Sequence, residues 1–318
     1  GGGWLSQLGN SLDLGHGAVD FAGSGVVHAM GGVAGLAGAI VLGARKGKFA
    51  ADGTPRALPG HHIPMAMLGT FILLFGWFGF NGASTFAASD MRFAVVVTNT
   101  LLAAAFGGTA AMLVMWKKFG KPDPSMSANG MLAGLVAITA PCAFVQPWAA
   151  ALIGIIAGVL VIYAVLFVER VLKVDDPVGA VAVHGVCGLF GLLSVGIFAD
   201  GSYGAAWNGV DGTVRGILYE TDGFSFLGGD WGQLGAQAIA ALTAVVVGFS
   251  LSFAFFKIQD MIMGIRSSEE DEIGGLDMPE MGSMAYPDFL EARGPVFVAT
   301  DDVLAGGGAA TLRSEVGA

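Results

Sequence analysis

The chain has 318 residues, of which 54% are hydrophobic and 13% charged, and its formal net charge at pH 7 is −10. Ordinary soluble domains carry about 25% charged residues, so the composition argues against a soluble globular protein. The acidic residues lie mainly in one loop and in the tail after Lys257, so the charge describes the wetted parts and predicts no nucleic-acid partner. The 52 glycines have no period of three, which excludes collagen, and they suit closely packed transmembrane helices. We therefore predict an all-α polytopic membrane protein.

About seven apolar stretches follow one another along the chain, each close to the 20 residues that cross a bilayer. They cover residues 19–44, 62–83, 92–116, 127–145, 148–169, 178–199 and 233–260. Residues with turn chemistry separate them, for example at 52–55 and 121–124. The region 200–232 is rich in Gly, Asp and aromatic residues, and it is too polar to be a span.

The basic residues of the connecting loops predict how the chain crosses the membrane. The first, third and fifth connections are basic, whereas the second and sixth hold one arginine each and the fourth holds none. The basic residues are Arg45, Lys46, Lys48 and Arg56, then Lys117, Lys118 and Lys121, then Arg170 and Lys173. Lys and Arg favour the cytoplasmic side, so we expect residues 1–18 outside, a cytoplasmic tail and a multi-pass protein of the cell membrane.

The chain is predicted to divide into a transmembrane domain at 1–262 and a cytoplasmic regulatory tail at 263–318. In the tail, Ser268 is followed by four acidic residues, a pattern that predicts a helix start, because acids are favoured at the positive end of the helix dipole. Beyond about residue 290 the periodicity is lost, which favours a solvated end.

Two distant segments share one pattern around a histidine. The residues around His28 and those around His184 both read V-H-x-x-x-G-x-x-G-L. An ionisable side chain inside an apolar span is expensive and is a functional hypothesis by default. Two histidines in matching frames suggest an internal repeat that brings both to one central site. Haem ligation, proton relay and the lining of a solute path all remain open, and the surrounding Gly, Ala and Val favour a small solute.

Several other side chains allow both a structural and a functional interpretation. Trp77 and Phe80 belong to the aromatic cluster 75–81, which is either an interfacial belt or a gate whose ring faces attract a cation. Ser84 follows one turn later, as a solvated loop residue or as a hydroxyl offered to a solute. Asp20 is most simply a helix N-cap that also favours the dipole.

The remaining candidates favour structural roles. Three histidines lie at span ends or in loops and need no functional explanation: His16, His61 and His62. Cys142 and Cys187 both fall inside apolar spans, so we expect small buried residues with no disulfide, no metal site and no cofactor. Asp175 and Asp176 before Pro177 form another helix-start signal.

The motifs of this chain closely resemble those of the ammonium transporter (Amt/Rh) family, in its Amt-type members, from about residue 1 to 286. The residues that carry the resemblance are Asp20-Phe21-Ala22-Gly23-Ser24-Gly25-Val26-Val27-His28, Gly76-Trp77-Phe78-Gly79-Phe80-Asn81, Asp175-Asp176-Pro177, Val183-His184-Gly185-Val186-Cys187-Gly188, and the tail Gly264-Ile265-Arg266-Ser267 with Glu269-Glu270-Asp271. The chain departs at Gly179, where several members carry an aspartate.

The resemblance implies a homotrimer of eleven-helix subunits, each built from two inverted five-span repeats and a final long helix. The seven spans here would be the fifth to the eleventh, and the sequence would be incomplete at its N-terminus. One phenylalanine of the family's outer gate and one tryptophan of its recruitment site would then precede Gly1. A trimeric PII signalling protein is a possible partner at the cytoplasmic face.

The resemblance also implies roles for individual residues. His28 and His184 would be the twin pore histidines, Phe80 the surviving gate phenylalanine and Trp77 an aromatic residue at the mouth. The recruitment site would include Ser84 and the carbonyl of Ala22, and Asp20 would support that site without touching the ion.

The implied function is transport of ammonium and ammonia, which is not an enzymatic activity. Moving a bare ammonium ion into a low-dielectric pore costs on the order of tens of kcal/mol, and neutral ammonia costs far less. Recruitment followed by deprotonation would let NH3 pass and exclude K⁺ and Na⁺, which have no proton to give up. Two alternatives remain open: a seven-helix receptor or sensor, and a haem-binding membrane protein with both histidines as ligands. A retinal-type receptor needs a lysine at mid-depth, whereas Lys257 lies at the end of its span.

Overall fold

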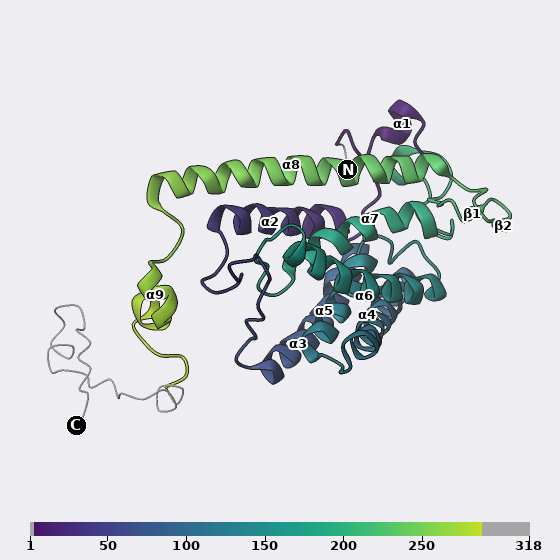
Figure 1. The fold of residues 1–318 in the computed structure, drawn as a ribbon. Helices are drawn as coiled ribbons and strands as arrows, with labels where there is room; N and C mark the ends of the chain where they lie inside the picture. Colours follow the sequence, from purple (N-terminus) through teal and green to yellow (C-terminus); the bar gives the residue numbers. More distant parts are fainter. Residues whose placement is uncertain (1–2, 288–318) are drawn as a thin grey trace, which may run out of the picture. The chain divides into compact units, whose positions relative to one another are not determined.

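The protein, seen here as a computed structural model, is described over residues 3–287. It divides into two compact units, Gly1–Arg266 and Ser267–Ala318. The first unit is a bundle of helices (Figure 1), and the second contributes two short helical pieces before residue 288. The predicted solvated end beyond about residue 290 lies outside the described residues.

The elements follow each other as helices with short connections. In chain order they are α1 (Leu8–Leu12), η1 (Ser24–Ala29), α2 (Met30–Leu42), α3 (Ile63–Gly82), η2 (Ala83–Thr85), α4 (Met91–Phe119), α5 (Pro124–Ile138), α6 (Pro147–Arg170), η3 (Val181–Val186), α7 (Cys187–Phe198), η4 (Trp207–Gly209), β1 (Tyr219–Glu220), β2 (Gly223–Phe224), α8 (Trp231–Met263), α9 (Glu269–Gly274) and η5 (Asp277–Met281).

The predicted membrane fold is confirmed, and six of the seven predicted spans form helices of sufficient length. Six helical segments are long and apolar enough to cross a bilayer: Ser24–Leu42, Ile63–Thr85, Met91–Phe119, Pro147–Arg170, Val181–Phe198 and Trp231–Met263. The stretch predicted at 127–145 forms only the 15-residue helix α5. After Ile138 the chain turns, and residues 139–145 stay completely buried.

Side chains from elsewhere in the chain explain why α5 can end inside the bundle. The Asn99 amide on α4 donates to the carbonyl oxygens of Cys142 and Val145, at 2.9 Å each. The Ser24 hydroxyl accepts from the Ala140 N–H at 2.7 Å. Buried backbone groups must be satisfied somewhere, and these bonds replace those that a continued helix would make.

The two-residue strands β1 and β2 pair antiparallel within the polar segment 200–232, which the sequence correctly excluded as a span. Two of the predicted helix starts are also confirmed. Asp176 accepts from the N–H groups of Ala180 and Val181 at 2.8 Å each. Ser268 caps α9 by accepting from the Asp271 N–H at 3.1 Å.

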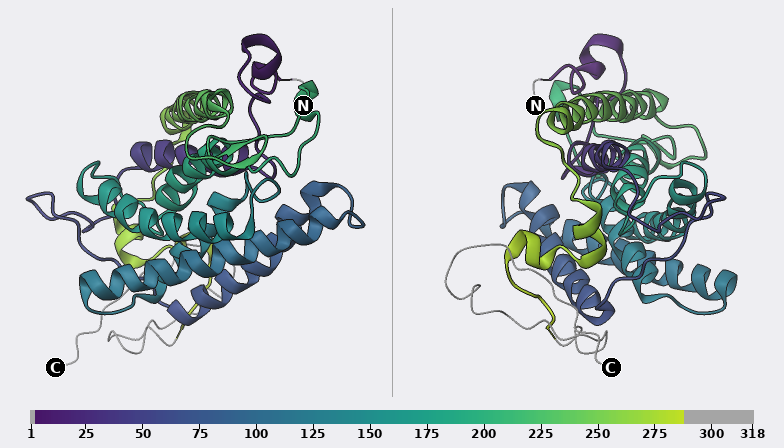
Figure 2. Two further views of the ribbon diagram at one scale, coloured as in Figure 1. Left: turned by 90° about the vertical axis from the view of Figure 1, so that its right-hand side faces the viewer. Right: turned by 60° about the vertical axis from the view of Figure 1, so that its left-hand side comes forward.

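Close backbone contacts hold α4, α5 and α6 together. A Cβ atom on Gly134 of α5 would lie 2.1 Å from the Ala103 carbonyl oxygen of α4, and one on Gly158 of α6 would lie 2.2 Å from that of Gly107. Small residues at such crossings let helices approach closely in a membrane. The long helix α8 packs against α2 and α7, and Figure 2 shows the same neighbours from two further directions.

Candidate functional site

The two histidines that share a sequence pattern also share an unusual local structure. His28 lies in η1 and His184 in η3, and each is a π-helical turn of six residues that runs directly into an α-helix. Such wide turns are rare and occur frequently at functional sites. The sequence repeat around the histidines is therefore a structural repeat as well.

The glycines of the repeat bring the two histidine segments into backbone contact. A Cβ atom on Gly32, four residues after His28, would lie 2.0 Å from the Gly185 nitrogen. A Cβ atom on Gly188, four residues after His184, would lie 2.8 Å from the Ala29 nitrogen. Each glycine thus meets the residue that follows the other histidine, so the crossing is nearly symmetric.

At this crossing the two imidazole rings lie against each other. Their Nδ1 atoms are 3.2 Å apart, and their ring centroids are 5.2 Å apart at an interplanar angle of 25°. One Nδ1 must donate a proton and the other must accept it, so the pair shares one proton at this contact. The Nε2 atom of His28 is buried and has no hydrogen-bond partner among the described residues.

Aromatic rings from α3 cover His28. The Trp77 ring stacks on it with centroids 5.1 Å apart and an angle of 18°, and the Phe80 ring lies 5.6 Å away. Trp77 is only 7% exposed, whereas Phe80 is 41% exposed. The sequence predicted that Trp77 and Phe80 lie on one helix. The structure shows in addition that both rings pack against His28.

A residue that sequence reasoning missed holds Trp77 in place. The indole N–H of Trp77 donates to the Thr139 hydroxyl at 3.0 Å, and that hydroxyl donates to the Leu135 carbonyl oxygen at 2.7 Å. The Thr139 carbonyl oxygen also accepts from the Ala22 N–H at 3.1 Å. The available signal was a lone hydroxyl residue two positions before Pro141 in an apolar run.

The segment before η1 is fixed by polar side chains. One carboxylate oxygen of Asp20 accepts from the Gly25 N–H at 3.0 Å and the Val26 N–H at 2.9 Å. The Ser24 hydroxyl donates to the Val136 carbonyl oxygen at 2.7 Å. This segment includes Ala22, so the backbone before His28 is held at both ends.

Among residues 3–287 the Ser84 hydroxyl makes no hydrogen bond to either histidine. It lies in η2, one turn after Phe80, and its hydroxyl donates to the Phe80 carbonyl oxygen at 3.1 Å. This bond uses the hydroxyl proton, so the Ser84 oxygen can still accept a hydrogen bond from a solute.

Two of the loop histidines are held by contacts of the fold. His62 accepts from the Met65 N–H at 3.0 Å and caps α3. His16 is only 6% exposed, and its backbone N–H donates to the Gln233 side chain of α8 at 2.9 Å. Burial lowers the pKa of His16, so it favours the neutral form.

Ion pairs gather where α2 ends. The Arg45 Nε atom lies 2.8 Å from the Asp175 carboxylate, and a second Arg45 nitrogen lies 3.0 Å from its other oxygen. Burial opposes the charged form, but the Arg45 bonds outweigh it and lower the pKa of Asp175. Lys48 pairs with Glu169 nearby. These contacts join the loop after α2 to the loop before η3, through Asp175, and to the end of α6, through Glu169.

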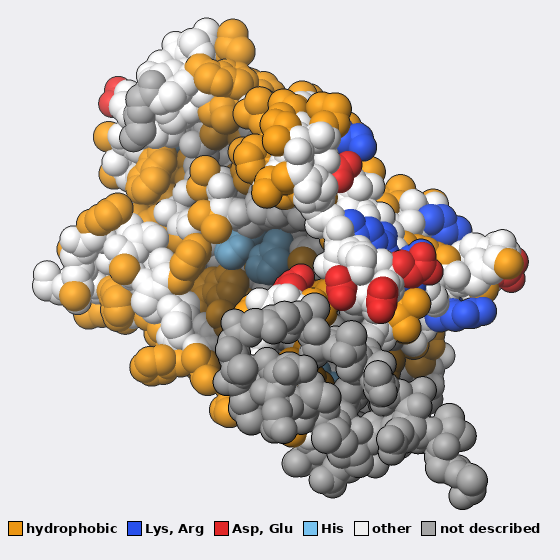
Figure 3. All heavy atoms as spheres, turned by 90° about the vertical axis from the view of Figure 1, so that its left-hand side faces the viewer, with side chains coloured by type: hydrophobic (Ala, Val, Ile, Leu, Met, Phe, Trp, Pro, Cys, Tyr) orange, Lys and Arg blue, Asp and Glu red, His pale blue; other side chains and the backbone are white. Residues whose placement is uncertain are grey.

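The same end of the bundle contains a cavity of about 500 Å³, lined by residues of α2, α8 and the segment 172–175. Figure 3 looks onto the side where α2 and α8 end, and a hollow there exposes histidine side chains among hydrophobic ones.

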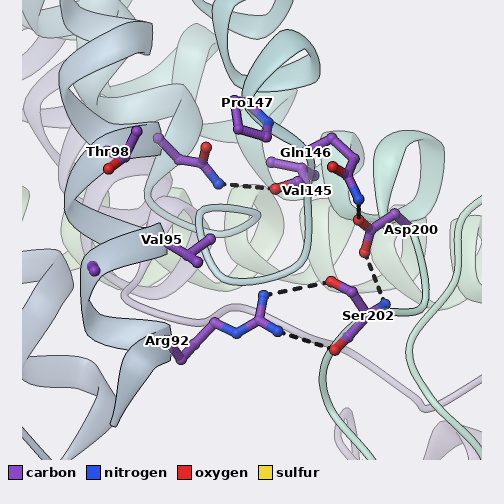
Figure 4. Close-up of a pocket in the computed structure, with 10 residues that line it drawn as sticks. Arg92, Val95, Thr98, Val145, Gln146, Pro147, Asp200 and Ser202 are labelled. Atoms are coloured by element: carbon purple, nitrogen blue, oxygen red, sulfur yellow. Dashed lines mark hydrogen bonds between the residues drawn. The ribbon is translucent and has the colours of Figure 1, made fainter. Parts of the chain in front are cut away.

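A second cavity, of about 470 Å³, lies between the beginnings of α4 and α6. Figure 4 shows its polar wall, where Arg92 donates to the Ser202 carbonyl oxygen at 3.0 Å and Gln146 is bound to Asp200. Arg92 also donates to the Ala143 carbonyl oxygen at 3.0 Å. These side chains tie the start of α4 to the segments 143–146 and 200–202.

Neither cavity, nor any other part of residues 3–287, contains three or more His, Cys, Asp or Glu side chains grouped to hold a metal ion. Both cysteines, Cys142 and Cys187, are buried and free.

Comparisons with known proteins show which family has a sequence like this one. The model of the Ammonium Transporter Family matches residues 1–286. Ammonium transporter Amt2 of Archaeoglobus fulgidus is 49% identical over 292 residues, which is 91% of this chain and 60% of that protein. Ammonium transporter Amt1 of Haloferax mediterranei is 38% identical over 309 residues, or 92% of this chain and 54% of that protein. The chain therefore spans a little over half the length of these curated relatives.

Solved structures agree with the sequence comparison. A structure titled "Sensor Amt Protein" has a TM-score of 0.75 at 38% identity, covering 88% of this chain and 62% of the other. Candida albicans Mep2 has a TM-score of 0.68 at 33% identity, covering 85% and 55%. With its membrane-spanning helices and a family match over nine-tenths of its length, the chain belongs to the ammonium transporter family.

Proposed function

We propose that the natural full-length protein transports ammonium across the membrane through a pore that contains His28 and His184. The observation that carries the proposal is the pair of buried imidazoles, with Nδ1 atoms 3.2 Å apart, beneath the rings of Trp77 and Phe80. The names of the relatives state ammonium transport of those proteins.

Recruitment takes place at the aromatic side of the pair. The ring faces of Trp77 and Phe80 attract a cation through their quadrupoles, and the carbonyl of Ala22 and the hydroxyl of Ser84 offer it oxygen atoms. Asp20 is proposed to support this site without touching the ion: one carboxylate oxygen accepts from the N–H groups that open η1, and the other oxygen is buried. It keeps the recruiting segment in place.

Deprotonation separates ammonium from other cations. The charged ion would lose on the order of tens of kcal/mol of hydration in a low-dielectric path, whereas neutral ammonia loses far less. NH3 therefore passes the imidazoles, whose neutral rings can donate to its nitrogen or accept from it, and which can carry the separated proton. K⁺ and Na⁺ cannot give up a proton, so they are excluded.

The proposed setting is the cell membrane, with residues 1–18 outside and the tail in the cytoplasm, as the basic loops favour. The transmembrane domain covers 1–262, and its spans correspond to the fifth to eleventh of an eleven-helix subunit with inverted repeats, assembled as a homotrimer. The matched π-helical turns of η1 and η3 support the inverted repeat.

The tail at 263–318 is proposed to be regulatory and to contribute to binding of a PII signalling protein. The capped helix α9 supports an ordered segment at its start. Truncation at Met263 should change either transport or PII binding at equal membrane abundance. Unchanged values of both would show that the tail is passive.

Uptake of methylammonium in cells lacking their own ammonium transporters tests the main proposal. His28→Ala and His184→Ala should each reduce uptake strongly while the assembled protein remains in the membrane. Full uptake by the folded double variant would refute the pore, and no uptake by the wild type would favour a receptor.

A further inference from the structure

We propose that Thr139 is a positioning residue that sets the spacing of the ammonium entrance, by binding the Trp77 ring with its hydroxyl and the Ala22 segment with its carbonyl. The inference rests on the proposed transport function and adds a residue to the site. Thr139 lies in the segment after α5 and would position two other parts of the site: the Trp77 ring on α3 and the Ala22 segment before η1.

The direction of the hydroxyl bond is fixed by the surroundings. Thr139 is fully buried, and its single hydroxyl proton is given to the Leu135 carbonyl oxygen at 2.7 Å. The oxygen is then free only to accept, and the Trp77 indole, which can only donate, supplies the proton at 3.0 Å. Donor and acceptor therefore match in one arrangement, and this arrangement orients the ring.

The backbone bonds of the same turn do not depend on the hydroxyl. The Thr139 carbonyl oxygen accepts from the Ala22 N–H at 3.1 Å, and the next carbonyl, of Ala140, accepts from the Phe21 N–H at 3.3 Å. Substitution of the side chain of Thr139 leaves these bonds in place. It removes only the hydrogen bond to Trp77. The position of the Trp77 ring can therefore be changed while the Ala22 segment stays in place.

Loss of that link has a direct consequence for His28. A buried indole N–H without a partner is costly, so the Trp77 ring gains by tilting toward another acceptor. The ring now stacks on His28 with centroids 5.1 Å apart at 18°, and a tilt would disturb this contact. The contact between the two histidines involves neither Trp77 nor Thr139, so recruitment should suffer more than passage.

The test measures the concentration dependence of methylammonium uptake by the full-length protein. For Thr139→Val, which keeps the shape and removes the acceptor, we expect the apparent KM to rise by up to about tenfold, the factor reached when the whole cost of one lost buried hydrogen bond falls on the substrate-bound state. The maximal rate should change much less. Thr139→Ser keeps the hydroxyl and should restore a near wild-type KM.

The chain offers a matched control in Thr100. Its hydroxyl also donates four residues back, to the Val96 carbonyl oxygen at 2.7 Å, and accepts from a side chain of α3, the Asn81 amide, at 2.9 Å. Thr100→Val makes the same chemical change away from Trp77 and should leave KM near the wild-type value. A general loss of packing would affect both variants alike.

A second background isolates the indole bond. In Trp77→Phe the ring has no N–H, so Thr139→Val should add little to the change in KM that Trp77→Phe already causes. An unchanged KM in Thr139→Val, or the same rise in both backgrounds, would overturn the inference. Should Thr139→Val not fold, Thr139→Cys, whose thiol is a weak acceptor, takes its place with the same expected direction, and an unchanged KM would overturn it equally. Absence of uptake in the wild type would instead refute the proposed function.

Discussion

Gly32 offers the sharpest perturbation of the histidine pair. It lies four residues after His28, where a Cβ atom would be 2.0 Å from the Gly185 nitrogen, whereas ordinary contacts begin at 3.4 Å. Gly32→Ala must therefore separate the two backbones by about 1.4 Å. Overpacking of this kind costs roughly 1–3 kcal/mol of folding free energy. If even a third of the separation reaches the rings, the contact of 3.2 Å exceeds hydrogen-bond distance.

We expect Gly32→Ala to abolish most methylammonium uptake while the assembled protein is still recovered from the membrane. Gly35→Ala is the matched control, because a Cβ atom there meets nothing within 4 Å in the described chain. Uptake by Gly32→Ala equal to that by Gly35→Ala, at equal abundance, would refute the view that this backbone crossing sets the histidine contact.

Two further predictions concern stability and use thermal unfolding in detergent. Asn99→Ala leaves the Cys142 and Val145 carbonyls without their side-chain donor, and it should destabilise the protein by roughly 2 kcal/mol; an unchanged unfolding temperature would contradict the explanation given for the short helix α5. Asp175→Asn removes the charge that pairs with Arg45 and should destabilise the protein at pH 7. Because the pKa of Asp175 is lowered in the folded state, the ion pair contributes above the ordinary carboxylate pKa of about 4, and its contribution is lost as the pH falls through the lowered value. The difference between wild type and Asp175→Asn should shrink below about pH 4, and a constant difference down to acid pH would contradict this account.

The repeat around the histidines was readable from the sequence because it depends on local spacing. A glycine four residues after a histidine lies one helical turn away on the same face, so the pattern places His28 and Gly32 together, and His184 and Gly188 likewise. The pattern could not predict which backbone segment each glycine contacts. Nothing local to Gly32 shows that it meets Gly185, because that contact joins segments 153 positions apart.

The missed features share a dependence on long-range hydrogen bonds. Hydropathy extended the fourth predicted span to residue 145, since it cannot detect that Asn99 satisfies the carbonyls of a turn. His16 sits near a polar loop in the sequence, but Gln233, 217 positions away, binds its backbone inside the protein. Thr139 carries no signal in its own neighbours beyond a lone hydroxyl in an apolar run. Its role becomes visible only when α3 supplies the indole.

The central claim is that ammonium crosses the membrane past the two facing imidazoles. The most direct test reconstitutes the full-length wild type and the His28→Ala/His184→Ala double variant in proteoliposomes at equal protein content, and measures methylammonium uptake with and without excess K⁺. The account predicts uptake by the wild type that K⁺ does not inhibit, and uptake by the double variant no higher than in protein-free liposomes. Wild-type uptake by the double variant, or inhibition by K⁺ as strong as inhibition by ammonium, would contradict it.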